Sequence, residues 1–149
     1  MPKPPLAKNI IRKALRAIVD PEPRKKEIYR LWEYFGSTCA YCGCPLDRKL
    51  SRAHIDHLIP GLNHISNRVL ACPTCNGNEK REEPWLDFLR KKVVDQTIFE
   101  TRKQRIESWV ASQLPSEPLN FDAKMLRSEI DNVVAAFDIA VKRLRSAKI

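Results

Sequence analysis

The chain of 149 residues is long enough for one domain, or for a small domain with helical extensions. Its 27 Lys and Arg outnumber its 18 Asp and Glu, and the net charge of +9 at pH 7 favours a polyanionic partner, although many basic proteins bind nothing of that kind. The sequence has no apolar run long enough to cross a membrane, and it begins without the apolar segment of a signal peptide, so no membrane association is expected.

The first part of the chain, residues 1–38, is expected to form a basic helical extension. Apolar residues recur at helical spacing over residues 6–19, and Pro21 ends that pattern. A second helix is predicted over residues 24–35, with Gly36 as its C-terminal cap. Nine Lys and Arg against four Asp and Glu give the extension a net charge of +5, so a surface that follows a phosphate backbone would include it.

The central part, residues 39–83, is polar and rich in turns. A Cys-x-x-Cys knuckle is followed by a strand at residues 53–59, which Pro60 ends, and by a second strand at residues 68–71. A second Cys-x-x-Cys knuckle then leads into the first turns of a helix at residues 76–82. Because so few apolar residues are available here, a bound metal ion would supply stability that a small core cannot.

The last part, residues 84–149, is predicted to be helical. One short helix is expected over residues 85–89, a second over residues 98–114 and a long third over residues 122–145. The long helix has apolar residues at alternating spacings of four and three: Leu126, Ile130, Val133, Phe137, Ala140 and Leu144. The stripe is short, so packing within the chain is favoured, with a homodimer or another protein partner as the alternative.

Four of the five cysteines form two pairs with zinc-ligand spacing. Cys39 and Cys42 make the first pair, and Cys72 and Cys75 make the second. Thiolates bind zinc tightly, and the spacing of the cysteines favours metal binding over disulfides, so a structural Zn²⁺ and a reducing cytoplasm are expected. Two unligated reactive pairs are the alternative. The remaining Cys44 is expected to be a free thiol that could compete as a ligand.

Between the two pairs lie side chains suited to hydrolysis. A neutral His can take a proton from water near neutral pH, while a carboxylate and an amide oxygen can hold a hard divalent ion. We therefore expect His57 to be the general base and Asp56 with Asn76 to be metal ligands. On spacing alone, a supporting pair or a capped strand end is an equally good interpretation. His54 could be a third ligand, but a surface or packing role is favoured.

One geometric condition applies to this pair. Consecutive residues of a regular strand point to opposite faces. Asp56 and His57 can therefore act on one phosphate only if the strand twists or ends there.

The order of these residues resembles the HNH endonucleases. The resemblance covers residues 39–80 and rests on the Asp56–His57 pair, the central Asn67, the two cysteine pairs and Asn76 directly after the last cysteine. It implies a ββα-metal core, in which two strands and a helix surround one divalent ion, together with the zinc knuckles that many members carry. The fold class expected is therefore α+β, with a small zinc-stapled ββα-metal core flanked by N- and C-terminal helices.

The resemblance also implies a role for each matching residue. His57 corresponds to the base that activates water, and Asn67 corresponds to the Asn that steadies the loop and orients the base. Asp56 and Asn76 correspond to ligands of the catalytic Mg²⁺ or Mn²⁺. Relatives cleave DNA, often as nickases or within larger assemblies.

Basic residues surround the expected site and are suited to contacts with phosphates. Each one alone is more simply a solvated charge, but two or more of the group are expected to contact the backbone of double-stranded DNA. The group is Arg52, Arg68, Lys80 and Arg81.

The function expected is hydrolysis of DNA phosphodiester bonds by a metal-dependent HNH endonuclease with a His-activated water. A zinc-stabilised module that binds nucleic acid or protein without catalysis would explain the charge and the cysteines equally well. A nuclease subunit that is active only with a partner is the third possibility.

Overall fold

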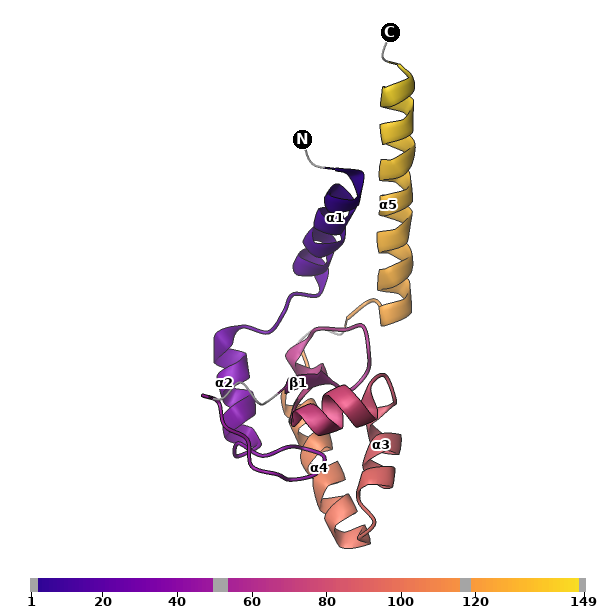
Figure 1. Ribbon diagram of the computed structural model, residues 1–149. Coiled ribbons are helices and arrows are strands. Elements are labelled where there is room, and N and C mark those ends of the chain that lie inside the picture. Colours follow the sequence, from indigo (N-terminus) through magenta and orange to yellow (C-terminus); the bar gives the residue numbers. More distant parts are fainter. Residues whose placement is uncertain (1–2, 50–53, 116–118, 148–149) are drawn as a thin grey trace. The chain divides into compact units, whose positions relative to one another are not determined.

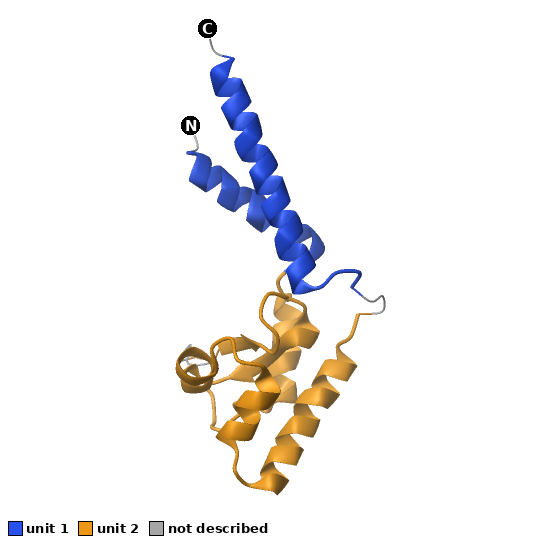
Figure 2. Cartoon of the chain, turned by 90° about the vertical axis from the view of Figure 1, so that its right-hand side faces the viewer, with its two compact units in different colours: residues 1–21, 119–149 blue, residues 22–118 orange. Residues whose placement is uncertain are grey.

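The computed structural model describes residues 3–49, 54–115 and 119–147. Two compact units divide the chain: unit 1 comprises residues 1–21 and 119–149, and unit 2 comprises residues 22–118 (Figure 2). The fold is α+β, as expected. Its elements in chain order are α1 (Pro4–Val19), α2 (Lys25–Tyr34), β1 (His54–His57), η1 (Ile65–Asn67), β2 (Arg68–Ala71), η2 (Thr74–Lys80), α3 (Trp85–Lys92), α4 (Gln96–Ser112) and α5 (Ala123–Ser146) (Figure 1). The division into residues 1–38, 39–83 and 84–149 stays a prediction.

A two-stranded antiparallel sheet forms the centre of unit 2. Strands β1 and β2 pair without a bulge, and His54 lies opposite Ala71 at one end while His57 lies opposite Arg68 at the other. All four residues of β2 are buried, in keeping with its apolar Val-Leu-Ala run. Strand β1 is shorter than the predicted segment 53–59.

Three helices enclose this sheet in a core rich in aromatic residues. In α4, Phe99, Ile106 and Trp109 are buried because their spacing places them on one face of the helix. The Trp109 ring packs edge-on against Phe35, with ring centroids 6.0 Å apart, and its indole N–H donates to the carbonyl of Arg68 over 2.8 Å. This hydrogen bond joins helix α4 to the start of strand β2.

The helix after the second knuckle is a seven-residue π-helix, η2, rather than the α-helix that the sequence suggested. The amide of Asn76 donates to the carbonyl of Cys72 over 3.0 Å, and the amide of Arg81 donates to the carbonyl of Asn76 over 3.3 Å. The hydrogen bonds of a π-helix join residues i and i+5, so its turns are wider than those of an α-helix. This wider turn fits η2, because its second residue, Cys75, also belongs to the second knuckle.

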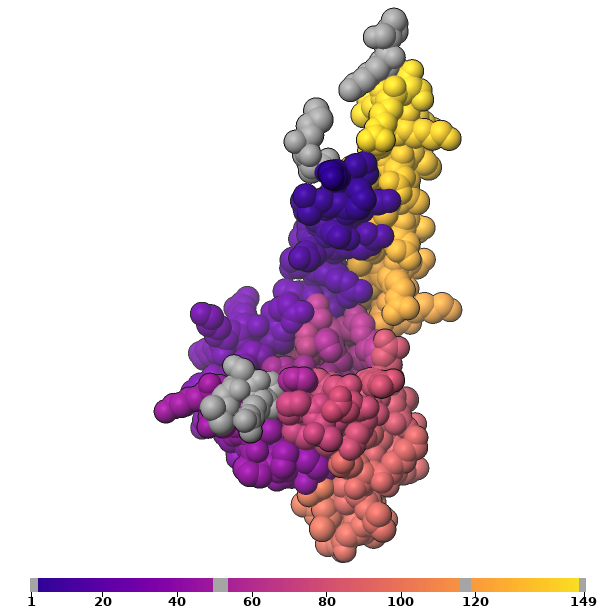
Figure 3. Space-filling model, viewed as in Figure 1, coloured from indigo at the N-terminus to yellow at the C-terminus, as the bar shows by residue number. Residues whose placement is uncertain are grey.

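Unit 1 consists of α1 and α5, which lie side by side (Figures 1 and 3). Leu126, Ile130 and Val134 are the buried residues of α5, and Lys8 of α1 forms an ion pair with Asp138 over 3.1 Å. Leu126 and Ile130 of the predicted stripe are therefore buried within the chain, whereas Val133 and Leu144 are 41% and 71% exposed, and a protein partner for this helix stays a prediction.

Membrane crossing would require a long apolar helix. Within the described ranges, none of the helices combines the necessary length and hydropathy.

Candidate functional site

The two cysteine pairs converge on one point. The Sγ atoms of Cys39, Cys42, Cys72 and Cys75 all lie within 4.8 Å of one another, and those of Cys42 and Cys72 are 3.8 Å apart. Tetrahedral zinc with Zn–S bonds of about 2.3 Å requires an S–S separation of about 3.8 Å, so the donor set fits zinc. The amide of Cys75 also donates to the Cys72 sulfur over 3.3 Å, which ties the two cysteines of the second knuckle together.

Contact between two of the thiols shifts their pKa values in opposite directions. Hydrogen bonding with Cys75 is the main reason why the pKa of Cys39 is lowered, and the same contact raises the pKa of Cys75. Cys39 is thereby favoured as thiolate, the form that ligates metal. Cys44 lies outside the four-sulfur group; its carbonyl accepts the amide N–H of Cys39 over 2.9 Å and so shapes the first knuckle.

Asp56 lies in the interior of unit 2, on the face of β1 that meets η2. Its side chain is 4% exposed, and Oδ2 accepts a 2.6 Å hydrogen bond from the Tyr41 hydroxyl. The same oxygen lies 3.2 Å from Nζ of Lys80, which also donates to the carbonyl of His57 over 2.9 Å. Burial, followed by the charge of Asp56, raises the pKa of Tyr41, so its phenol remains protonated and donates. Neither contact uses Oδ1 of Asp56.

His57 stands on the opposite face of the strand. Its Nδ1 lies 3.4 Å from Nη1 of Arg68, and its Nε2 lies 3.4 Å from Oδ1 of Asn63. A guanidinium can only donate, so Nδ1 has the lone pair and Nε2 carries the proton. Burial is the main cause that lowers the pKa of His57, and the positive charge of Arg68 acts in the same direction. The imidazole is therefore held neutral.

The regular pairing of β1 with β2 determines how the side chains of Asp56 and His57 are arranged. Asp56 lies opposite Val69 and His57 lies opposite Arg68, so both residues belong to the sheet and their side chains leave it on opposite faces. The strand ends at His57. The two groups thus flank the end of one strand from its two sides.

Asn67 fastens the connection between the strands. Its amide nitrogen donates to the carbonyls of Ile59 and Leu62 over 2.7 and 2.9 Å, and its Oδ1 accepts the amide N–H of Ile59 over 2.9 Å. These are the contacts expected of a residue that steadies the loop beside His57.

Asn76 lies in η2, and His54 lies two residues before Asp56 on the same face of β1. Asn76 is half-buried in η2, the helix whose last residue reaches Asp56. A Cβ atom built on Gly77 would lie 3.8 Å from Cε1 of His54, so His54 packs against η2 as well. This packing agrees with the structural role that was favoured for His54.

The four expected phosphate contacts differ in where they lie. Arg81 is exposed, but the side chains of Lys80 and Arg68 are only 0% and 6% exposed. Arg68 forms a 2.7 Å ion pair with Glu22 and donates to Asn63, so its charge is used inside the protein. These contacts engage both cations within the protein, and their contact with DNA stays a prediction. Arg52 lies outside the described residues.

Sequence reasoning did not identify three supporting residues. Tyr41 stands inside the first knuckle, Asn63 stands in the loop between the strands, and Glu22 follows α1. Tyr41 alone carried a signal, since a large aromatic side chain inside a metal knuckle has no solvent-facing role.

Comparison with known proteins agrees with the geometry. Residues 39–82 match the family model described as HNH endonuclease, and this match confirms the resemblance inferred from the motif. No curated protein matches the chain. The matched segment includes both knuckles, both strands and η2, whereas α3 and α4 lie beyond it.

Proposed function

We propose that the HNH endonuclease domain at residues 39–82 hydrolyses DNA phosphodiester bonds with a water molecule that His57 activates. The observation that carries this proposal is the state of His57: a half-buried imidazole at the end of β1, with one nitrogen engaged as a donor and with a lowered pKa. A neutral imidazole at the end of a strand is the group that a general base requires.

The proton would pass to Nδ1 of His57. Nε2–H donates to Asn63, and the contact between Nδ1 and Arg68 is long at 3.4 Å, so a water molecule can compete for the lone pair. The oxygen of that water attacks phosphorus, Nδ1 takes its proton, and the bond between phosphorus and the leaving oxygen breaks. The guanidinium of Arg68 stands beside the nitrogen that receives the proton, where it opposes premature protonation of the base.

Asp56 and Asn76 would hold the catalytic Mg²⁺ or Mn²⁺. Oδ1 of Asp56 and the amide oxygen of Asn76 are hard donors of the kind that these ions prefer. When bound, the ion supplies positive charge to the phosphate and to the leaving oxygen. Lys80 already offsets the charge of Asp56, so we expect weak binding until the phosphate itself adds oxygen ligands.

The substrate class follows from the domain and from the charge. An HNH domain implies a nucleic acid, and we propose duplex DNA. Arg81 and Arg52 remain proposed backbone contacts. Unit 1 carries 11 Lys and Arg against 5 Asp and Glu. It therefore contributes six of the nine net positive charges of the chain, an excess over its own acidic residues. This excess would attract DNA from a distance and make the association sensitive to salt.

One observation favours the non-catalytic alternative. The carboxylate of Asp56 is already hydrogen-bonded by Tyr41 and paired with Lys80, which is how a purely structural aspartate is satisfied. A zinc-stabilised module that binds DNA without cutting it is therefore the second candidate. Exposed apolar residues on α5, Ile139 at 53% and Leu144 at 71%, favour a third, in which the nuclease requires a protein partner.

Nicking of a supercoiled plasmid tests the proposal. We expect the wild-type protein to nick in Mg²⁺ or Mn²⁺ but not in EDTA, and we expect His57→Ala to reduce the rate about 100-fold or more, as loss of a general base does. His64→Ala is the matched control, because His64 caps η1 and is assigned no proton transfer. Zinc content and circular dichroism establish that each variant is folded.

Two results would count against the proposal. Equal nicking by His57→Ala and the wild-type protein would remove the base from its role. Binding of DNA by the zinc-loaded wild-type protein, without cutting in any divalent metal, would favour the binding module or the partner-dependent subunit.

A further inference from the structure

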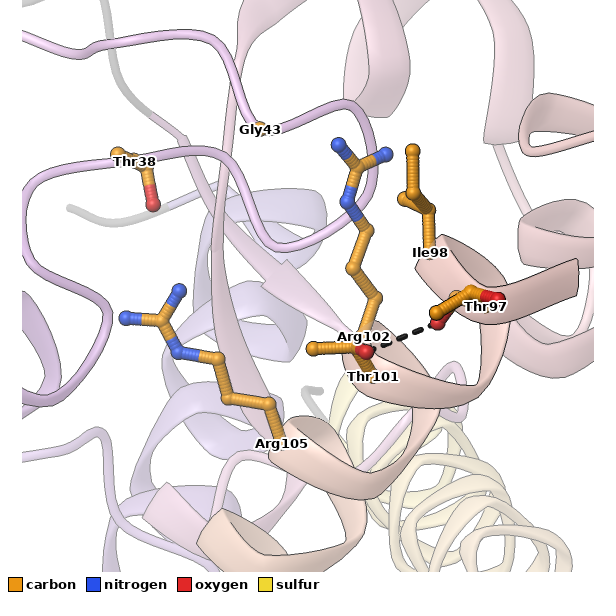
Figure 4. Close-up of a pocket in the computed structure, with 7 residues that line it drawn as sticks. All are labelled: Thr38, Gly43, Thr97, Ile98, Thr101, Arg102 and Arg105. Carbon is orange, nitrogen blue, oxygen red and sulfur yellow. Dashed lines mark hydrogen bonds between the residues drawn. The ribbon is translucent and has the colours of Figure 1, made fainter. Parts of the chain in front are cut away.

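An arginine from outside the matched domain reaches the first zinc knuckle. Nη1 of Arg102, on α4, donates to the carbonyl of Tyr41 over 2.7 Å. A Cβ atom built on Gly43 would lie only 2.7 Å from Nη2 of the same residue. Figure 4 shows the side chain rising from α4 toward the loop that carries Gly43. The guanidinium thus contacts the backbone at two points within the knuckle.

The position of this contact gives it a purpose. The half-buried guanidinium of Arg102 donates to the backbone of the turn between Cys39 and Cys42, and this turn presents two of the four zinc ligands. The hollow beside it, about 310 Å³ in volume, is lined by Thr38, Gly43, Thr97, Ile98, Thr101, Arg102 and Arg105, so its charged groups are both cationic.

We propose that Arg102 is a positioning residue for the structural zinc: it holds the Cys39–Cys42 turn in its ligating form. Partners beyond the ligands commonly control metal affinity in this way. The proposal does not depend on nuclease activity, and α4 lies beyond the residues that match the HNH model.

Gly43 is the counterpart of Arg102 in this arrangement. Its φ of +76° is unfavourable for any other residue, and its missing Cβ leaves the space that the guanidinium occupies. Gly36 supplies a comparison within the same unit. Its φ is +55°, but a Cβ there would lie 3.7 Å from Nη2 of Arg105, an ordinary contact distance.

Zinc release to a chromogenic chelator measures the effect directly. We expect Arg102→Gln to lower zinc affinity about 10- to 100-fold, the range typical of lost outer partners of a metal site. Arg102→Lys should fall between, because it keeps the charge and loses the planar fork. Arg105→Gln is the matched control: Arg105 donates to Tyr34, at the end of α2, over 2.8 Å and lies over the Phe35 ring. Equal losses in Arg102→Gln and Arg105→Gln would overturn the proposal.

The glycines provide a second test that does not require Arg102→Gln alone to fold well. We expect Gly43→Ala to accelerate zinc release more than Gly36→Ala does. The added Cβ at residue 43 would lie 2.7 Å from Nη2 of Arg102, whereas the one at residue 36 would make an ordinary contact with Arg105. That excess should shrink when Gly43→Ala is combined with Arg102→Lys, because the shorter cation no longer presses on residue 43. Equal effects of the two glycine substitutions, or strict additivity with Arg102→Lys, would contradict a direct contact.

Discussion

Lys80 illustrates how a charge can serve the interior of a small domain. Its ammonium group is buried between the carboxylate of Asp56 and the carbonyl of His57. Removing two charges from water is costly, and a buried pair persists only when hydrogen bonds satisfy both partners. Here the Tyr41 hydroxyl gives Oδ2 of Asp56 a second partner, and the His57 carbonyl gives Lys80 a second partner. One cation therefore fixes the backbone and the acidic side chain at the end of β1.

The proposed general base, His57, determines the pH dependence that we expect of cleavage. Burial and then Arg68 lower its pKa below the ordinary value of 6.5. A general base works only when it is unprotonated, so a lowered pKa extends activity to more acidic solutions. We expect the acid limb of kcat/KM to lie below pH 6.5, and we expect Arg68→Gln to move it upward. The rate profile, together with an NMR titration of His57, checks both expectations.

The NMR titration needs an assignment and a control. His57→Ala identifies the resonance of His57 among the three histidines. Lys91→Gln removes an exposed charge of the same sign at a distant surface position and should leave the profile unchanged. If Arg68→Gln left the pKa of His57 where it was, burial alone would set the acid limb.

Residue identity and spacing located the motif but not the environment of each residue. The resemblance to the HNH endonucleases implied that Asn67 steadies the loop, and its three hydrogen bonds are with that loop. Lys80 and Arg68 were expected on the surface because long basic side chains are mostly solvated. Their burial depends on partners far apart in the sequence, Asp56 and Glu22, which no local pattern reveals.

At the scale of secondary structure, α4 supports the domain from outside the matched segment. The indole N–H of Trp109 satisfies the buried carbonyl of Arg68 at the start of β2. We expect Trp109→Phe to lower the free energy of unfolding by about 1–3 kcal/mol, since the carbonyl loses its partner while the ring is largely replaced. Urea denaturation followed by circular dichroism measures the change.

A second tryptophan supplies the comparison. Trp85 is half-buried at the start of α3 and packs against the core. Trp85→Phe removes a similar area of ring but leaves the hydrogen bond between Trp109 and Arg68 in place. We therefore expect it to lower the free energy of unfolding less than Trp109→Phe does. A loss in Trp85→Phe equal to that in Trp109→Phe would show that ring area, rather than the hydrogen bond, matters.

Periodicity predicted the helices well because proline and glycine mark their ends. Helix α2 was expected over residues 24–35 and spans Lys25–Tyr34, followed by Gly36 in a left-handed conformation. The same signals missed the π-helix η2, since hydrogen-bond spacing has no signature in apolar periodicity. Proline, glycine and periodicity also gave no indication that Arg102 of α4 would reach the first knuckle, because Arg102 and Tyr41 are about sixty positions apart in the sequence.

At the scale of the whole molecule, the four-cysteine cluster is part of the core of unit 2. Cys39 and Cys75 are buried together with Tyr41 and Leu70. We expect about one zinc per chain, and we expect zinc removal by a chelator to lower the unfolding temperature markedly, because metal binding and folding are coupled in such domains. Elemental analysis and thermal denaturation test this.

Single cysteine substitutions separate the ligands from the surplus thiol. Cys39→Ser should reduce zinc content and stability, whereas Cys44→Ser should keep both, since its sulfur lies outside the four-sulfur group. Loss of zinc from Cys44→Ser would instead make that thiol a ligand.

Tyr41 joins the two halves of this chemistry. Its backbone belongs to the first knuckle, where Arg102 holds it, and its hydroxyl donates to Asp56. Binding events at the two ends of one rigid residue share a coupling free energy, and such coupling is reciprocal. Whatever factor zinc adds to the affinity of the Asp56 carboxylate for a ligand, that ligand returns to zinc. We therefore expect the loss of zinc at the knuckle to change the affinity of the Asp56 carboxylate for a metal ion, and the loss of that ion to change the affinity for zinc by the same factor.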